Sequence, residues 1–248
     1  MTVFRVQSHN GDIFNTTYPR RDVMGLLDKK IAQFPRPPRI SIQLPAHHQT
    51  TPFAMSPNDK NTLVIDFRWL GYAARLRTLP DFSTPYEKAG SEAEGLARLI
   101  NGLRKIAPDC PVDVVAHRLG ARVAILAVRI ARSKMWRNLL LTNAFEYSAR
   151  TLVALDCPMG RHLNFHNIIT HQNNITSLFF DRFGPKPGPA DRAICFGYKF
   201  AHSNWSEVLD TDLAATRLLL AMGANTFALT APHRNPVVNI FGRSLSKV

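Results

Sequence analysis

The chain has 248 residues, of which 45% are hydrophobic and 20% are charged. This composition excludes a largely disordered chain and favours one globular domain over residues 1–248 with a sizeable core. The 31 basic residues outnumber the 18 acidic ones and give a net charge of +13, and such a positive field favours an anionic small molecule or an acidic protein as partner.

The order of the apolar patterns predicts strands that alternate with helices. In the first half of the chain we expect an edge strand at Val3–Val6, a helix at Asp22–Phe34, strands at Arg39–Leu44 and Thr62–Phe67, and one long helix at Tyr86–Ala107. In the second half we expect a strand at Val112–Ala116, a helix at Ala121–Arg132, a strand at Leu139–Thr142, a helix at Ser148–Leu155, a strand at His166–Thr170, helices at Ile175–Arg182 and Leu213–Met222, and a last strand at Thr226–Thr230. This alternation is typical of an α/β fold, with a mostly parallel central sheet and helices on both faces.

Several other classes of protein find no support in the sequence. The basic residues form no long block and match no nucleic-acid motif, so specific recognition of nucleic acid is not expected. No stretch of eighteen apolar residues and no signal-peptide pattern is present, so we expect neither a transmembrane segment nor secretion. The three cysteines, Cys110, Cys157 and Cys195, are far apart and odd in number, which favours free thiols in a reducing, cytoplasmic setting. Cys157 as a replacement nucleophile is the weaker interpretation, because no base stands next to it.

The segment Val112–Val123 carries the most informative pattern, which reads V-D-V-V-A-H-R-L-G-A-R-V. It predicts a buried strand, a sharp turn at His117–Gly120 and then a helix. This is the arrangement of the nucleophile elbow, in which a Gly-x-Ser-x-Gly motif places a serine on a strained strand-to-helix turn. The small flanking residues are Ala116 and Gly120, and the central position is Arg118.

On this motif the chain resembles the α/β-hydrolase family, and more narrowly an esterase-like bacterial branch of it. The resemblance spans most of the sequence, and its best-fitting parts are Glu92–Ile100, Ala116–Val123, Asn173–Pro187 and Asn204–Trp205. It implies an α/β-hydrolase fold with a serine at the elbow, an acid after a late strand and a histidine after the last strand, in that chain order.

Carried onto this sequence, the family's catalytic pattern is mostly lost. The serine position is Arg118, the acid position is Asn174, and only the histidine is retained, at His233. The oxyanion loop matches Pro45–His48, where Ala46 stands in place of a glycine. An arginine stays protonated and is no nucleophile, and an asparagine cannot stabilise an imidazolium ion. The resemblance therefore implies a catalytically degenerate site.

Two functions follow as hypotheses. In the first, the protein binds an anionic ligand or a protein partner, with Arg118, His233 and His47 as ligand-binding residues. In the alternative, it is an active carboxylic-ester-type hydrolase in which His233 acts as a base on water and Arg118 stabilises the oxyanion. Arg118 has a structural interpretation as well, in which it pairs with a carboxylate. A metal site at His47 and His48 with His233 or His117 has no recognisable ligand spacing, so no metal and no cofactor are expected.

Overall fold

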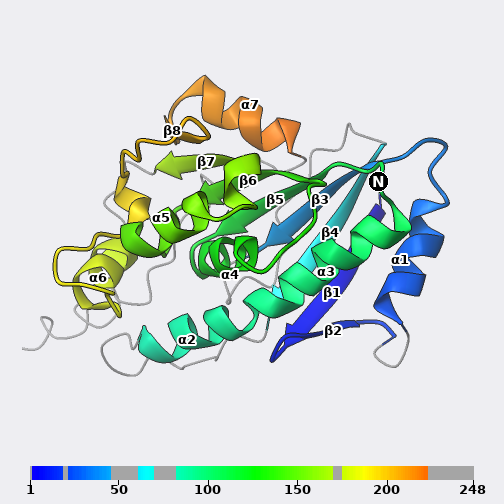
Figure 1. Cartoon of the computed structure of the whole chain (residues 1–248), viewed down its shortest axis with the longest axis horizontal. Coiled ribbons are helices and arrows are strands. Elements are labelled where there is room, and N and C mark those ends of the chain that lie inside the picture. Colours follow the sequence, from blue (N-terminus) through cyan, green and yellow to red (C-terminus); the bar gives the residue numbers. More distant parts are fainter. Residues whose placement is uncertain (1, 19–21, 46–60, 70–81, 170–174, 223–248) are drawn as a thin grey trace, which may run out of the picture.

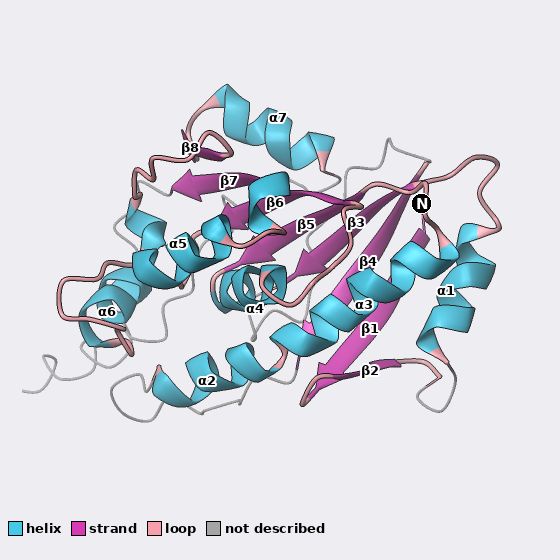
Figure 2. Cartoon of the chain, in the orientation of Figure 1, coloured by secondary structure: helices cyan, strands magenta, loops and turns pink. Residues whose placement is uncertain are grey.

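An eight-stranded sheet forms the centre of the molecule (Figures 1 and 2). The computed structural model describes residues 2–18, 22–45, 61–69, 82–169 and 175–222. The strands are β1 (Thr2–His9), β2 (Asp12–Asn15), β3 (Arg39–Leu44), β4 (Thr62–Trp69), β5 (Val112–His117), β6 (Trp136–Thr142), β7 (Asn164–Ile169) and β8 (Trp205–Leu209). Their order is β2-β1-β4-β3-β5-β6-β7-β8, and every neighbouring pair is parallel except β1 and β2. The predicted α/β class with a mostly parallel sheet is confirmed.

Helices cover both faces of this sheet. They are α1 (Val23–Ile31), α2 (Ser83–Ser91), α3 (Ala93–Ile106), α4 (Leu119–Val128), α5 (Ser148–Asp156), α6 (Ile175–Phe183) and α7 (Leu213–Ala221), with short 3-10 turns at Gly160–His162 and Ile194–Phe196. Alternate residues of β5 separate the two faces. Val114 belongs to the large core beneath α1–α5, whereas Val115 packs with Ala215 and Leu219 of α7. None of the helices described is long and apolar enough to cross a membrane.

The first strand differs from its prediction because a hairpin extends the sheet. We expected Val3–Val6 at the edge, but β2 folds back beside β1 and takes that place. The turn is Asn10–Gly11, and both residues have positive φ, 51° and 82°. Asn-Gly is the preferred pair for a two-residue hairpin turn, so the signal was in the sequence and the interpretation as an edge strand was wrong.

The single long helix expected at Tyr86–Ala107 is two helices that meet at Glu92. Its buried carboxylate accepts hydrogen bonds from Ser8 Oγ (2.5 Å) and from the backbone N–H of Asn10 (2.9 Å). The break therefore accompanies a contact with the β1–β2 hairpin, more than 80 residues away in sequence. A local pattern contains no trace of such a contact, and the prediction of one helix was wrong.

Strand β8 was not predicted. Trp205 is buried and packs against Phe165 and Phe200, with ring centroids 6.1 and 4.8 Å apart. Asn204 donates hydrogen bonds to the carbonyl oxygens of residues 160 and 163. These contacts hold the start of β8, which adds a parallel partner to β7. The strand expected at Thr226–Thr230 lies outside the described residues.

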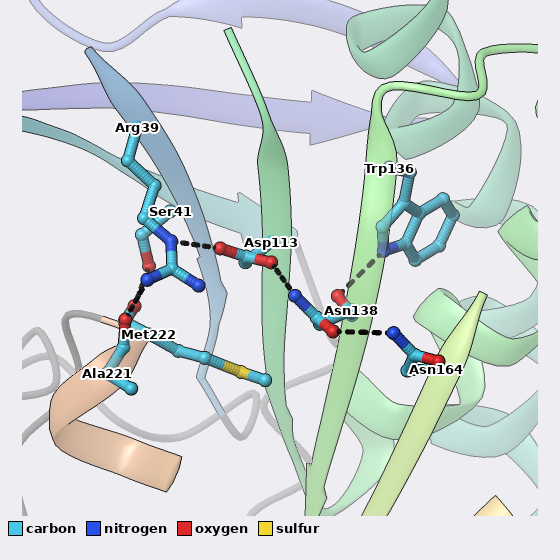
Figure 3. A network of polar contacts seen from close by, with 8 residues as sticks. All are labelled: Arg39, Ser41, Asp113, Trp136, Asn138, Asn164, Ala221 and Met222. Carbon is cyan, nitrogen blue, oxygen red and sulfur yellow. Dashed lines mark hydrogen bonds and ion pairs between the residues drawn. The ribbon is translucent and has the colours of Figure 1, made fainter. Parts of the chain in front are cut away.

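A polar network on the α7 side joins four strands where they begin (Figure 3). Buried Asp113 accepts hydrogen bonds from the Arg39 guanidinium and from Asn138 Nδ2, and Asn164 Nδ2 continues the row to Asn138 Oδ1 (3.1 Å). Arg39 also donates to the carbonyl oxygen of Ala221, and Ser41 Oγ donates to that of residue 222 (2.6 Å). Carbonyls at a helix C-terminus lack partners within the helix, so this network fastens the end of α7 to the sheet.

Candidate functional site

Arg118 stands at the sharp turn between β5 and α4. Its backbone angles are φ 50° and ψ −119°, in a region that side-chain-bearing residues rarely occupy. Asn143, directly after the neighbouring strand β6, is a second non-glycine residue with positive φ, 48°. Each such residue costs on the order of 1–3 kcal/mol, and such residues cluster at functional sites. Two adjacent strands therefore end in strained turns at the carboxyl edge of the sheet.

Hydrogen bonds between these two turns hold Arg118 in its conformation. The backbone N–H of Arg118 donates to the carbonyl oxygen of Thr142 (3.1 Å), and the N–H of Phe145 donates to the carbonyl oxygen of Arg118 (3.0 Å). Next to the turn, a hydrogen bond of 2.9 Å joins buried His117 Nδ1 to Thr142 Oγ1. The surrounding backbone thus fixes the strained geometry from both sides.

The small residues around the turn are explained by close approach of the backbone. A Cβ atom on Gly120 would lie 2.7 Å from the carbonyl oxygen of Leu44 on β3. Ala116, at the end of β5, is fully buried. The predicted strand, sharp turn and helix are confirmed, and α4 begins two residues earlier than expected, at Leu119.

The Arg118 side chain is partly buried and packs against an aromatic ring. Burial lowers the pKa of Arg118 to about 10, which still leaves the side chain cationic at neutral pH. Its Cζ atom is 5.8 Å from the centroid of the Phe145 ring, within the range of a cation–π contact. The Phe145 ring is in turn stacked on Phe180, with centroids 4.7 Å apart. A positive charge is therefore held beside an aromatic wall at the N-terminus of α4.

In one interpretation of the sequence, Arg118 pairs with a carboxylate. The structure has a buried carboxylate in the loop directly after β6. Glu146 is fully buried, and its Oε2 forms an ion pair of 2.8 Å with Nη1 of Arg122, one helical turn after Arg118. Glu146 also accepts hydrogen bonds from the Tyr86 hydroxyl and from the backbone N–H of Tyr147 (2.9 Å). Burial, followed by the charge of Glu146, raises the pKa of Tyr86. This carboxylate is thus engaged by Arg122.

Sequence reasoning missed the Arg122–Glu146 pair for a simple reason. The two residues are 24 positions apart, and although Arg122 lies in the elbow segment, that motif assigns it no role. Only the packing of α4 against the loop after β6 brings them together. The sequence offered one signal, which was Arg122 on the buried face of the predicted helix. A buried cation needs a partner of opposite charge.

The other residues predicted for the site fall on parts of the chain that the structure does not describe. Asn174, His233, His47 and its neighbours Ala46 and His48 all lie outside the described residues. Their relation to Arg118 therefore stays a prediction.

The candidates Cys157 and His117 are described. All three cysteines are free thiols. Cys157 follows α5, and its Sγ contacts the carbonyl oxygen of residue 128 at the end of α4, at the edge of the sheet opposite Arg118. Among the residues described, no group of histidine, cysteine and acidic side chains has the arrangement of a metal site.

A cavity of about 330 Å³ is found at that same opposite edge. It lies between the ends of α1 and α3 and is lined by Ile31, Phe34, Arg36, Ile106 and Cys110, among others. The amino ends of β3 and β5 are nearby, whereas Arg118 follows the carboxyl end of β5. The cavity is therefore separate from the Arg118 turn.

Two comparisons with known protein sequences identify no relative for this chain. A scan against protein-family models matches none of them, and a search of curated proteins finds no similar sequence. The functional argument consequently rests on the geometry around Arg118.

Proposed function

We propose that this protein is a catalytically degenerate α/β-hydrolase-like protein that binds an anionic ligand at Arg118, in a reducing compartment such as the cytoplasm. One observation carries the proposal. Arg118, a partly buried cationic side chain, stands at the positive-φ turn directly before α4. The free thiols of all three cysteines support the compartment. The hydrolase resemblance rests on the strand–turn–helix with its close Gly120–Leu44 approach and on the mostly parallel sheet.

An anion relieves the cost of burying this cation. Moving a guanidinium from water into an apolar environment costs free energy, and the lowered pKa of Arg118 is the sign of that cost. An arginine fork binds a carboxylate or a phosphate through two parallel hydrogen bonds. Helix α4 begins at the next residue, Leu119. The N–H groups and the dipole of a helix N-terminus favour a negative charge there. Both features select an anion for the same place.

Serine-type catalysis does not fit the residue at the elbow. At neutral pH Arg118 carries a proton that its lowered pKa of about 10 still retains, so it offers no lone pair for attack on a carbonyl carbon. Asn174, which the resemblance places at the acid position, carries no charge to orient and stabilise a histidine. Binding is the function that these residue types support.

Equilibrium binding measured by calorimetry tests this proposal. Acetate, butyrate and inorganic phosphate are the probes, and Arg118→Met keeps the length of the side chain without its charge. We expect at least one anion to bind the unmodified protein and to lose at least tenfold in affinity in Arg118→Met. Arg217→Met, which removes a charge from the exposed face of α7, should leave binding unchanged. Equal binding by all three proteins, or by none, would overturn the proposal.

An active hydrolase is the second candidate, and one observation favours it. The strained elbow geometry, φ 50° and ψ −119°, is preserved although no serine requires it. In this alternative Arg118 stabilises an oxyanion and His233 activates water. Hydrolysis of short-chain aryl esters that disappears in both Arg118→Met and His233→Ala would establish this activity. Turnover that survives His233→Ala would rule out the histidine as the base.

A further inference from the structure

Exposed basic side chains gather at the amino edge of the sheet, opposite Arg118. In a parallel sheet the crossover helices end where the next strand begins, so the connections α3–β5 and α4–β6 lie side by side at this edge. Six exposed basic residues stand there, and we call them the basic edge. They are Arg104, Lys105, Arg129, Arg132, Lys134 and Arg137. Arg36 and Arg161 extend it on either side, and the exposed acidic residues Asp109 and Asp156 interrupt it.

Contacts between the connections make the basic edge one continuous surface. Arg104 Nη1 donates to the carbonyl oxygen of Arg132 (3.5 Å), and the backbone N–H of Arg132 donates to Asn101 Oδ1 on α3 (2.8 Å). Cys157 Sγ joins the end of α5 to the end of α4. On the other side, the cavity between α1 and α3 includes Arg36 and Asp109 in its lining. The charges therefore line up along the strand starts from β3 to β7.

The requirements of the fold do not account for this surface. Basic residues in the last turn of a helix stabilise its dipole, and this explains Arg104 and Lys105 on α3. Arg129 is the C-cap residue of α4 and can serve that helix in the same way. Arg132, Lys134 and Arg137 lie beyond the helix end, so the dipole of α4 does not explain them.

The basic edge also differs from several other arginines of the described chain in its lack of ion pairs. Five arginines that do not belong to the basic edge are paired with acidic side chains, namely Arg5, Arg39, Arg68, Arg98 and Arg122. No residue of the basic edge forms an ion pair with another described residue. The positive charge at this edge is thus left for an external partner.

The side chains at this edge indicate the chemistry of that partner. Four of the six are arginines, whose planar fork matches phosphate oxygens. A membrane surface would also need apolar side chains to insert. Ile130 is the one exposed large hydrophobic residue in these connections as far as the structure describes them. Base stacking needs exposed aromatic rings, and the described residues show none along the α4–β6 connection. A linear polyanion contacted through its phosphates fits best.

We propose that the basic edge binds the phosphate backbone of nucleic acid without reading its sequence. With Arg36 and Arg161 included, the exposed basic residues run from the start of β3 to the start of β7, which is three strand spacings or about 14 Å. A DNA duplex carries about eight phosphate charges over that length when both strands are counted, so the phosphates that face the protein can engage several of the basic side chains. This function is independent of the anion site at Arg118, because the two lie at opposite edges of the sheet.

Fluorescence anisotropy with a labelled 30-base-pair DNA duplex of random sequence tests this proposal, and a double-stranded RNA and a single strand serve as further probes. The edge variant is Arg129→Gln with Arg132→Gln and Lys134→Gln, all exposed. The matched control removes three exposed charges away from this edge, by Arg182→Gln, Arg192→Gln and Arg217→Gln. Both variants lower the net charge equally, so position alone distinguishes them.

We expect salt-dependent binding of the duplex by the unmodified protein. The edge variant should bind at least about tenfold more weakly in about 0.1 M salt, and the slope of log K against log[salt] should fall by about 1 for each phosphate that the variant leaves without a basic side chain. The control variant and Arg118→Met should stay within about twofold of the unmodified protein.

Three results would overturn the proposal. The first is the absence of binding to every nucleic acid probe. The second is equal weakening by the edge and control variants, which would mean that only net charge matters. The third is equally tight binding of polyglutamate or of phosphatidylserine vesicles, which would assign the edge to acidic proteins or to membranes. Thermal unfolding of each variant checks that it is folded.

Discussion

Replacing Arg118 by methionine should make the protein more stable. Burial lowers the pKa of Arg118 from its ordinary value to about 10. Each tenfold change in an ionisation constant corresponds to about 1.4 kcal/mol, so the buried charge destabilises the fold by about 3 kcal/mol. Methionine has a similar length, carries no charge and tolerates an apolar site. Methionine loses the contacts of the guanidinium, among them the one with the Phe145 ring, so only part of this cost is recovered. We therefore expect Arg118→Met to raise the free energy of unfolding by about 1–2 kcal/mol, which urea denaturation measures as a higher midpoint at an unchanged slope.

Arg122→Met is the matched control, because it makes the same change four residues later on the same helix. Arg122 pairs with fully buried Glu146. Its removal leaves that carboxylate without its cation and should cost about 3–5 kcal/mol. The two variants should consequently shift the midpoint in opposite directions. If Arg118→Met destabilised the protein as Arg122→Met does, then Arg118 would be a structural ion-pair residue and the anion site would lose its basis.

Three further predictions test other parts of the structure. Asp113→Ala removes the partner of Arg39 at the end of α7, so it should cost about 3 kcal/mol and speed hydrogen exchange of the α7 amides; unchanged exchange would contradict the fastening role. Gly120→Ala forces a Cβ atom against the carbonyl oxygen of Leu44 and should cost about 1–3 kcal/mol in urea denaturation, whereas a neutral effect would mean that the turn has room to move. Burial lowers the pKa of His166, with Asp113 opposing the shift, so the folded state binds protons less readily than the unfolded state. Stability should therefore fall as pH drops below about 6.5, and His166→Gln should reduce that dependence between about pH 7.5 and 5.5; an equal dependence in both proteins would refute this assignment.

The sequence determined the class of fold and the place of the central turn. The apolar runs at β4 and β5 are typical of buried parallel strands, β3 shows the alternating pattern of a strand, and the predicted positions of all three agree with the structure. The turn at Arg118 was recognised because small residues at Ala116 and Gly120 are needed wherever a strand and a helix approach closely. These features depend on neighbours in the chain, so a single sequence contains them.

The tertiary structure decided which charges are compensated. Glu92 interrupts a helix because a distant hairpin binds its carboxylate, and Glu146 engages Arg122 across 24 residues. The basic edge appears in the sequence only as scattered arginines and lysines, because parallel topology returns every crossover helix to one edge of the sheet. A sequence pattern reports its own neighbourhood, whereas the ion pairs of this protein, and the charges left without them, depend on contacts between segments that are far apart in the chain.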